Sequence, residues 1–117
     1  MQERDLLLRW LRAFFEGLNK LLNKSSVDKK EIQEIYSSFF GKNRAYFLEY
    51  EGIIMIEEMF SENDDITKKE KLVALCQLME LDLTIEQDSE LRSILENHIK
   101  SINNLLLKKY GFYKVSF

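Results

Sequence analysis

The chain lacks most of the residues from which catalytic and metal sites are assembled. It contains one cysteine, Cys76, one histidine, His98, and no proline among its 117 residues. A lone cysteine cannot form a disulfide within the chain, so the sequence does not imply an oxidising compartment. Proline makes up about 5% of average sequences, and its absence favours uninterrupted helices because proline breaks a helix interior. The four glycines are isolated, which excludes a Gly-rich phosphate-binding loop.

Charge and hydropathy exclude further classes of protein. The net charge is -3, with basic and acidic residues interspersed, whereas binding to nucleic acid needs a concentrated positive patch. Charged residues interrupt the apolar stretch near the N-terminus, so we do not expect a signal peptide. No apolar run approaches the roughly 20 residues of a membrane-spanning helix. We therefore expect a cytoplasmic protein that binds no nucleic acid and does not associate with membranes.

Apolar residues recur at three- and four-residue steps along nearly the whole chain, which is the period of an amphipathic helix. In the first predicted helix this stripe comprises Leu7, Leu11, Phe14, Leu18 and Leu21. The pattern predicts five helices, at about residues 3–23, 25–40, 44–60, 67–82 and 88–110.

Residues that begin and end helices stand between these segments. Ser25-x-x-Asp28 and Thr67-x-x-Glu70 each fit a capping box, in which a hydroxyl and a carboxylate satisfy free backbone N–H groups. We also expect Asn43 to cap the third helix and Asp88 or Ser89 to begin the fifth. Gly41 and Gly111 are expected to end helices, since glycine adopts the left-handed conformation readily.

These elements predict an all-α fold. Short connections favour antiparallel neighbours, and helix pairs that start roughly forty residues apart suggest stacked helical hairpins. We expect about five antiparallel helices in one domain of residues 1–117, as a tetratricopeptide-like array or a compact bundle. The third helix, apolar on most sides, is expected at its centre, with Ile53, Ile54 and Ile56 covered. Truncation at the C-terminus stays open, because the chain stops on the apolar Phe117.

The residues that could serve in catalysis or metal binding also have structural explanations. His98 has Ile94 and Ile102 at the four-residue spacing of a metal pair, so we expect a packed histidine. Cys76 stands among apolar residues and is expected to be buried. The acidic stretches 57–65 and 82–90 lack the glycine of a calcium loop and are interpreted as solvated helix ends. We therefore predict no catalytic, cofactor-binding or metal-ligating residue, and no enzymatic activity.

The first helix has the sequence RDLLLRWLRAFFEGLNKLL at residues 4–22. With the capped hairpins that follow, it resembles small uncharacterised bacterial proteins with tetratricopeptide-like helical arrays. The tetratricopeptide signature itself is absent, since Trp10 is followed by Leu11 and no proline ends a repeat. The resemblance concerns architecture alone. It implies protein–protein interaction and transfers no functional residue.

Three functions are compatible with this sequence. The favoured one is a non-enzymatic helical module for protein–protein interaction or scaffolding. An alternative is a helical regulator that binds a small molecule in a pocket. The third is an enzyme that uses carboxylates. The residues that would form the pocket are Phe14, Tyr46, Tyr50 and Met79, and the carboxylates would be those of Glu49, Glu51, Glu57 and Glu58.

An interaction surface is predicted from apolar side chains that lie beside the main stripe of the first predicted helix or in the segment after the last one. Exposed apolar patches usually mark contact surfaces, and a self-complementary patch closes most simply in a two-fold dimer. We therefore expect a protein partner or a homodimer. The predicted surface residues are Trp10, Phe15, Phe112, Tyr113 and Phe117.

Overall fold

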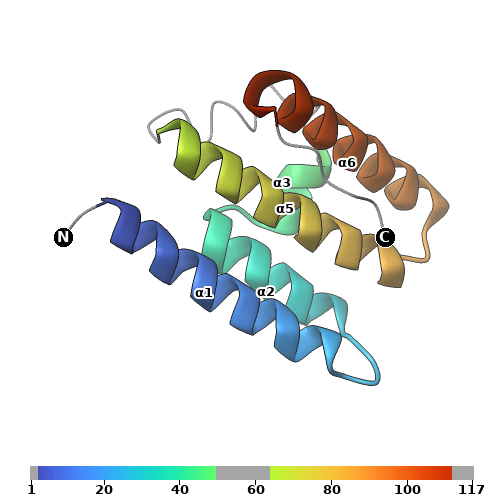
Figure 1. Ribbon diagram of the computed structural model, residues 1–117. Coiled ribbons are helices and arrows are strands. Elements are labelled where there is room, and N and C mark those ends of the chain that lie inside the picture. Colours follow the sequence, from blue (N-terminus) through green and yellow to red (C-terminus); the bar gives the residue numbers. More distant parts are fainter. Residues whose placement is uncertain (1–2, 50–63, 112–117) are drawn as a thin grey trace. The chain divides into compact units, whose positions relative to one another are not determined.

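The computed structural model describes residues 3–49 and 64–111, and every regular element in these ranges is an α-helix (Figure 1). This confirms the predicted all-α class. The predicted third helix extends beyond the described residues, which also leave out Ile53, Ile54 and Ile56. The helices are α1 (Glu3–Leu22), α2 (Lys29–Phe40), α3 (Arg44–Glu49), α5 (Asp65–Ile85) and α6 (Ser89–Tyr110).

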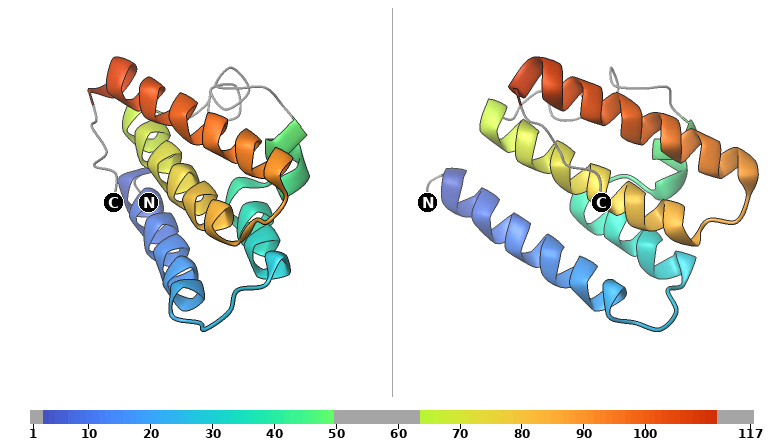
Figure 2. Two further views of the ribbon diagram at one scale, coloured as in Figure 1. Left: turned by 90° about the vertical axis from the view of Figure 1, so that its right-hand side faces the viewer. Right: turned by 45° about the vertical axis from the view of Figure 1, so that its right-hand side comes forward.

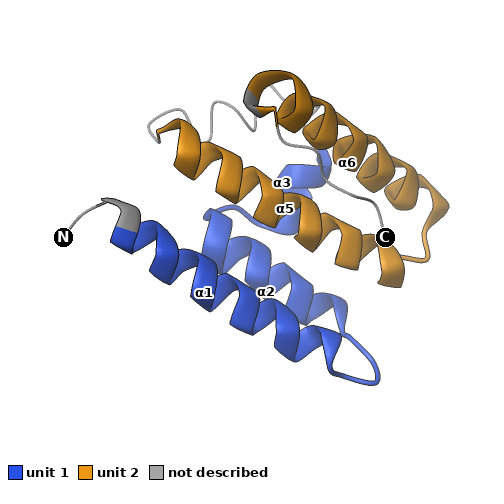
Figure 3. Ribbon diagram, in the orientation of Figure 1, with its two compact units in different colours: residues 1–49 blue, residues 50–117 orange. Residues whose placement is uncertain are grey.

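Two compact units divide the chain, residues 1–49 and residues 50–117 (Figure 3). The first unit contains α1, α2 and α3, and the second contains α5 and α6. In each unit, two helices lie side by side and run in opposite directions, α1 with α2 and α5 with α6 (Figure 2). The predicted antiparallel hairpins are therefore present. The single domain and the stacking of one hairpin on another stay predictions.

An aromatic cluster forms the core of the first unit. The fully buried Phe14 ring stacks on Trp10, with their centroids 5.4 Å apart, and meets Phe39 and Phe40 edge to face. Phe47 extends the cluster into α3, since its ring lies 6.1 Å from that of Phe40. Such edge-to-face contacts add about 0.5–1.5 kcal/mol per pair to the burial of apolar area. The helical stripe predicted for α1 is confirmed, because four of its five residues are buried and Leu11 is half-buried.

Both predicted capping boxes were wrong. The N-cap of α2 is Asp28 instead of Ser25, and its Oδ1 accepts a hydrogen bond from the backbone N–H of Lys30 at 3.1 Å. The N-cap of α5 is Asp64, whose Oδ1 accepts from the N–H of Thr67 at 2.7 Å. In both places an aspartate stands three residues from the hydroxyl residue. Aspartate caps as well as serine and better than threonine. The backbone is extended at the aspartates, which places the helix starts there.

The other predicted helix ends are confirmed. Asn43 Oδ1 accepts from the N–H of Tyr46 at 2.9 Å, and the Asp88 carboxylate caps α6. Gly41 and Gly111 have φ angles of +74° and +64° and end α2 and α6. A side chain would strain the backbone in this left-handed region, so glycine is favoured there.

The second unit is held together by α5, which is buried over most of its circumference. Its buried side chains are not confined to a single stripe, since residues 74–76, 78–79 and 81–82 are all covered. Helix α6 contributes a narrower stripe with a spacing of three, four and four residues. The buried residues of that stripe are Leu95, His98, Ile102 and Leu106.

Candidate interaction grooves

The two described residues of the predicted interaction surface both lie partly within the aromatic cluster. Trp10 is half-buried, and its Nε1 donates a hydrogen bond to the backbone oxygen of Phe39 at 3.2 Å. Phe15 is also half-buried and meets Phe14 edge to face. These contacts use part of each ring within the first unit. A role at a surface stays a prediction, and Phe112, Tyr113 and Phe117 lie outside the described residues.

A groove of about 280 Å³ lies between α1 and α2 on the surface of the first unit, and we call it the α1–α2 groove. Its floor is apolar. Leu21 and Ile35 line it and are buried, and Gly17 and Phe39 line it and are half-buried. A Cβ atom built on Gly17 would lie 3.9 Å from Cε2 of Phe39, an ordinary contact distance. The missing side chain at Gly17 therefore leaves this part of the groove open.

The two walls of the α1–α2 groove carry charges of opposite sign. Lys20 lines it from α1 and Lys24 from the α1–α2 connection, whereas Glu31 and Glu34 line it from α2. Lys24 and Glu31 form an ion pair within the unit. Lys20 and Glu34 are exposed and make no hydrogen bond or ion pair with any residue in ranges 3–49 and 64–111. One basic and one acidic side chain thus remain available to a molecule in the groove.

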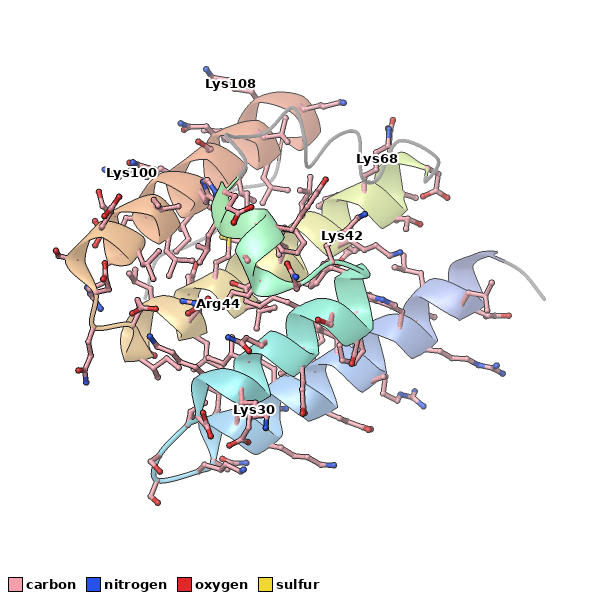
Figure 4. The ribbon with its side chains drawn as sticks, turned by 180° about the vertical axis from the view of Figure 1, so that it is seen from behind. Lys30, Lys42, Arg44, Lys68, Lys100 and Lys108 are labelled. Atoms are coloured by element: carbon pink, nitrogen blue, oxygen red, sulfur yellow. The ribbon has the colours of Figure 1, made fainter. Side chains whose placement is uncertain are left out.

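A second groove, of about 440 Å³, lies beside α2 and the start of α3. We call it the α2–α3 groove. It shares Glu34 and Ser38 with the α1–α2 groove, so the two flank the exposed side of α2. Lys30 and Arg44, both labelled in Figure 4, line it as well. Ala45 is the one apolar residue in its lining, and the other lining residues are polar or charged.

Two acidic residues at the end of α5 are buried, so the interpretation of the stretch 82–90 as a solvated helix end is wrong for Asp82 and Glu86, although Asp88 and Glu90 are exposed. Asp82 is fully buried, and Glu86 is 2% exposed. Glu86 Oε2 accepts hydrogen bonds from the backbone N–H groups of Gln87 and Asp88, both at 3.0 Å. Because a buried carboxylate is tolerated only with such donors, Glu86 has a structural role in the turn between α5 and α6.

Cys76 and His98 are both buried in the second unit, as predicted. The Sγ atom of Cys76 lies 3.6 Å from Oε1 of Glu80 and 3.7 Å from Oδ1 of Asn103, so it belongs to the contact between α5 and α6. Within the described residues, no cluster of three or more His, Cys, Asp or Glu side chains is arranged to hold a metal ion.

The residues of the two alternative functions belong to different units or lie outside the described ranges. Phe14 and Tyr46 belong to the aromatic cluster of the first unit, and Met79 is buried in α5. Glu49 is exposed at the end of α3. None of these four residues lines either groove. The remaining residues named for the pocket and for the carboxylates lie outside the described ranges.

The sequence did not single out the α1–α2 groove. Neither Lys20 nor Glu34 belongs to a motif that would mark it as a binding residue. The signal would have been the opposite charge of two helix faces that come together. Reading it requires the register between α1 and α2, which the period of either helix alone does not contain.

Comparisons of the chain with protein-family models, with curated proteins and with solved structures found no match. Among the helices of the described ranges, none combines the length and the apolar character needed to cross a membrane.

Proposed function

We propose that the chain is a non-enzymatic protein–protein interaction module whose α1–α2 groove receives a helical segment. The observation that carries the proposal is the composition of this groove, an apolar floor between a basic wall and an acidic wall. An amphipathic helix fits such a site, because its apolar stripe covers the floor while charges on either side meet the walls. Apolar contact then supplies affinity, and the charged walls determine orientation.

A small-molecule regulator is less well supported by the two grooves. Ligand sites typically measure roughly 300–1,000 Å³ and are lined mainly by apolar side chains. The α2–α3 groove has a suitable volume, but every residue in its lining except Ala45 is polar or charged. The α1–α2 groove has an apolar floor but a smaller volume of about 280 Å³. A partner that covers the groove from outside, as a helix does, makes better use of its shape.

The proposal includes a cytoplasmic location and a tetratricopeptide-like arrangement of the helical hairpins, of the kind found in small bacterial proteins. Two antiparallel pairs, α1 with α2 and α5 with α6, are the units from which such arrays are built. Arrays of this type present grooves between helices to their partners. The α1–α2 groove lies between two helices of one hairpin and is suited to the same use.

Site-specific photo-crosslinking in the native host tests the proposed function. A photoreactive amino acid replaces Ser38, which is exposed and lines both grooves, or Asn97, which is exposed on α6 and serves as the control. We expect a discrete crosslinked protein from position 38 and none from position 97. Adding Gly17→Leu, which fills the groove, should remove that product. Identical products from both positions, or a product that survives Gly17→Leu, would contradict the proposal.

A further inference from the structure

We infer that the helical partner of the α1–α2 groove is a second copy of the same hairpin, bound about a two-fold axis that runs along the groove. This inference rests on the proposed function and names its partner. It is carried by the opposite charges of the two groove walls. Lys20 of α1 and Lys24 of the α1–α2 connection form the basic wall, and Glu31 and Glu34 of α2 form the acidic wall.

Two-fold symmetry makes such a groove complementary to itself. Rotation about an axis along the groove exchanges its two walls and places the basic wall of one copy against the acidic wall of the other. Rotation about an axis across the groove would instead oppose lysine to lysine and glutamate to glutamate. A closed dimer requires one patch that fits its own copy, and the first orientation satisfies this requirement with charges of a single chain.

The pairing of charges within one chain indicates which residues make the new contact. Lys24 is already paired with Glu31 at the end of the groove near the α1–α2 connection. Lys20 and Glu34 form no such pair in the described part of the chain, and both are exposed. In the dimer, Lys20 faces the partner's Glu34 and Glu34 faces the partner's Lys20. The interface therefore contains two equivalent ion pairs.

The direction of the helices and the small residues of the groove also fit this arrangement. Because α1 and α2 are antiparallel within one hairpin, an axis along the groove sets α1 of one copy antiparallel to α2 of the other. The result is the neighbour relationship of an antiparallel four-helix bundle. Gly17 and Ser38 line the groove with little side-chain volume. They permit the partner helices to approach the apolar floor formed by Leu21, Ile35 and Phe39.

The experiment is a charge exchange followed by sedimentation equilibrium at low ionic strength. We expect the unmodified chain to dimerise, and Lys20→Glu or Glu34→Lys to raise the dissociation constant at least tenfold, because each opposes like charges twice. An equimolar mixture of these two variants should dimerise like the unmodified chain, since both ion pairs form again, one in the original order and one with its charges reversed. The variant that carries both Lys20→Glu and Glu34→Lys should dimerise by itself, since both of its ion pairs form with reversed charges. Lys100→Glu, an exposed change on α6, is the matched control and should leave the dissociation constant within about twofold.

The mixture distinguishes contact between chains from an effect within one chain, because mixing cannot repair an altered monomer. Circular dichroism verifies that each variant is folded. If a single variant is not folded, the double variant still tests the interface. A monomer at millimolar concentration, or single variants that dimerise normally, would overturn the inference. So would a mixture that fails to recover. Crosslinking of a different protein at position 38, together with a monomeric chain, would refute the second copy and leave the proposed function intact.

Discussion

Arg92 Nη1 donates a hydrogen bond to the backbone oxygen of Leu83, in the last turn of α5, at 2.6 Å. The same nitrogen lies 2.8 Å from the backbone oxygen of Glu86. The last carbonyl groups of a helix have no partner within the helix, and a cation is favourable beside them because of the helix dipole. Arg92 on α6 thus satisfies the end of α5 and links the two helices of the second unit.

Replacing Arg92 with methionine should lower the free energy of unfolding by about 1–2 kcal/mol. The substitution removes two charge-assisted hydrogen bonds but keeps an apolar stem against the helix, and the half-exposed position moderates the loss. Urea titration measures the change. Arg92→Lys keeps the charge but not the planar fork of donors, so an intermediate value is expected. A loss below about 0.3 kcal/mol for methionine would show that water replaces the guanidinium without cost.

Trp10, the only tryptophan of the chain, also satisfies a carbonyl group at the end of a helix, in this case in the first unit. Its Nε1 donates to the backbone oxygen of Phe39, which belongs to the last turn of α2 and has no acceptor role within that helix. Trp10→Phe keeps an aromatic ring but leaves this carbonyl without its donor, and it reduces the stacked area on Phe14. We expect a loss of about 1–2 kcal/mol in urea unfolding. Unchanged stability would mean that the hydrogen bond contributes nothing beyond solvation.

The helices and their buried faces could be predicted because both follow from a local period. Leu7, Phe14, Leu18 and Leu21 are buried since the helical repeat brings them to one side, whatever the neighbour is. The burial of Asp82 could not be predicted in this way. An acidic residue near a helix end is normally solvated, and only the packing of the surrounding elements decides otherwise.

The errors at the helix starts have a different cause. At Ser25 and Asp28, as at Asp64 and Thr67, two good capping residues stand three positions apart. The sequence leaves the choice between them nearly balanced. The choice depends on where the chain is extended before it enters the helix, which is a property of the loop. The grooves escaped prediction for a similar reason, because they depend on the register between two helices.

A pair of glycine substitutions separates backbone strain from simple loss of flexibility. Gly17 lies within α1, where an added Cβ meets only Phe39 at 3.9 Å, so Gly17→Ala should raise the free energy of unfolding by about 0.5–1 kcal/mol. Gly41 has a φ of +74° at the end of α2, so Gly41→Ala should lower it by about 1 kcal/mol despite open space around it. Thermal unfolding of both variants measures the two changes, and equal signs would refute this account.

The ammonium group of Lys71 should make stability depend on alkaline pH. Burial of this half-buried side chain in α5 lowers its pKa from the ordinary lysine value of 10.5. Between the lowered pKa and 10.5 the unfolded chain holds more protons than the folded one, so stability rises with pH across that window. The cost of burying the charge is fully present below the folded pKa, decreases as the pH rises from that pKa to 10.5, and is absent above 10.5.

Lys71→Met removes this titration while retaining most of the apolar stem. As the pH increases from about 7 to about 10.5, the free energy of unfolding of the unmodified chain should therefore increase relative to that of Lys71→Met. The reason is that only the unmodified chain loses a buried charge. Urea titrations at several pH values measure the difference between the two proteins, which cancels the titration of all other groups. Lys100→Met, at an exposed position on α6, is the control. A difference that stays constant with pH, or that changes in favour of the variant, would show that the Lys71 charge is not desolvated.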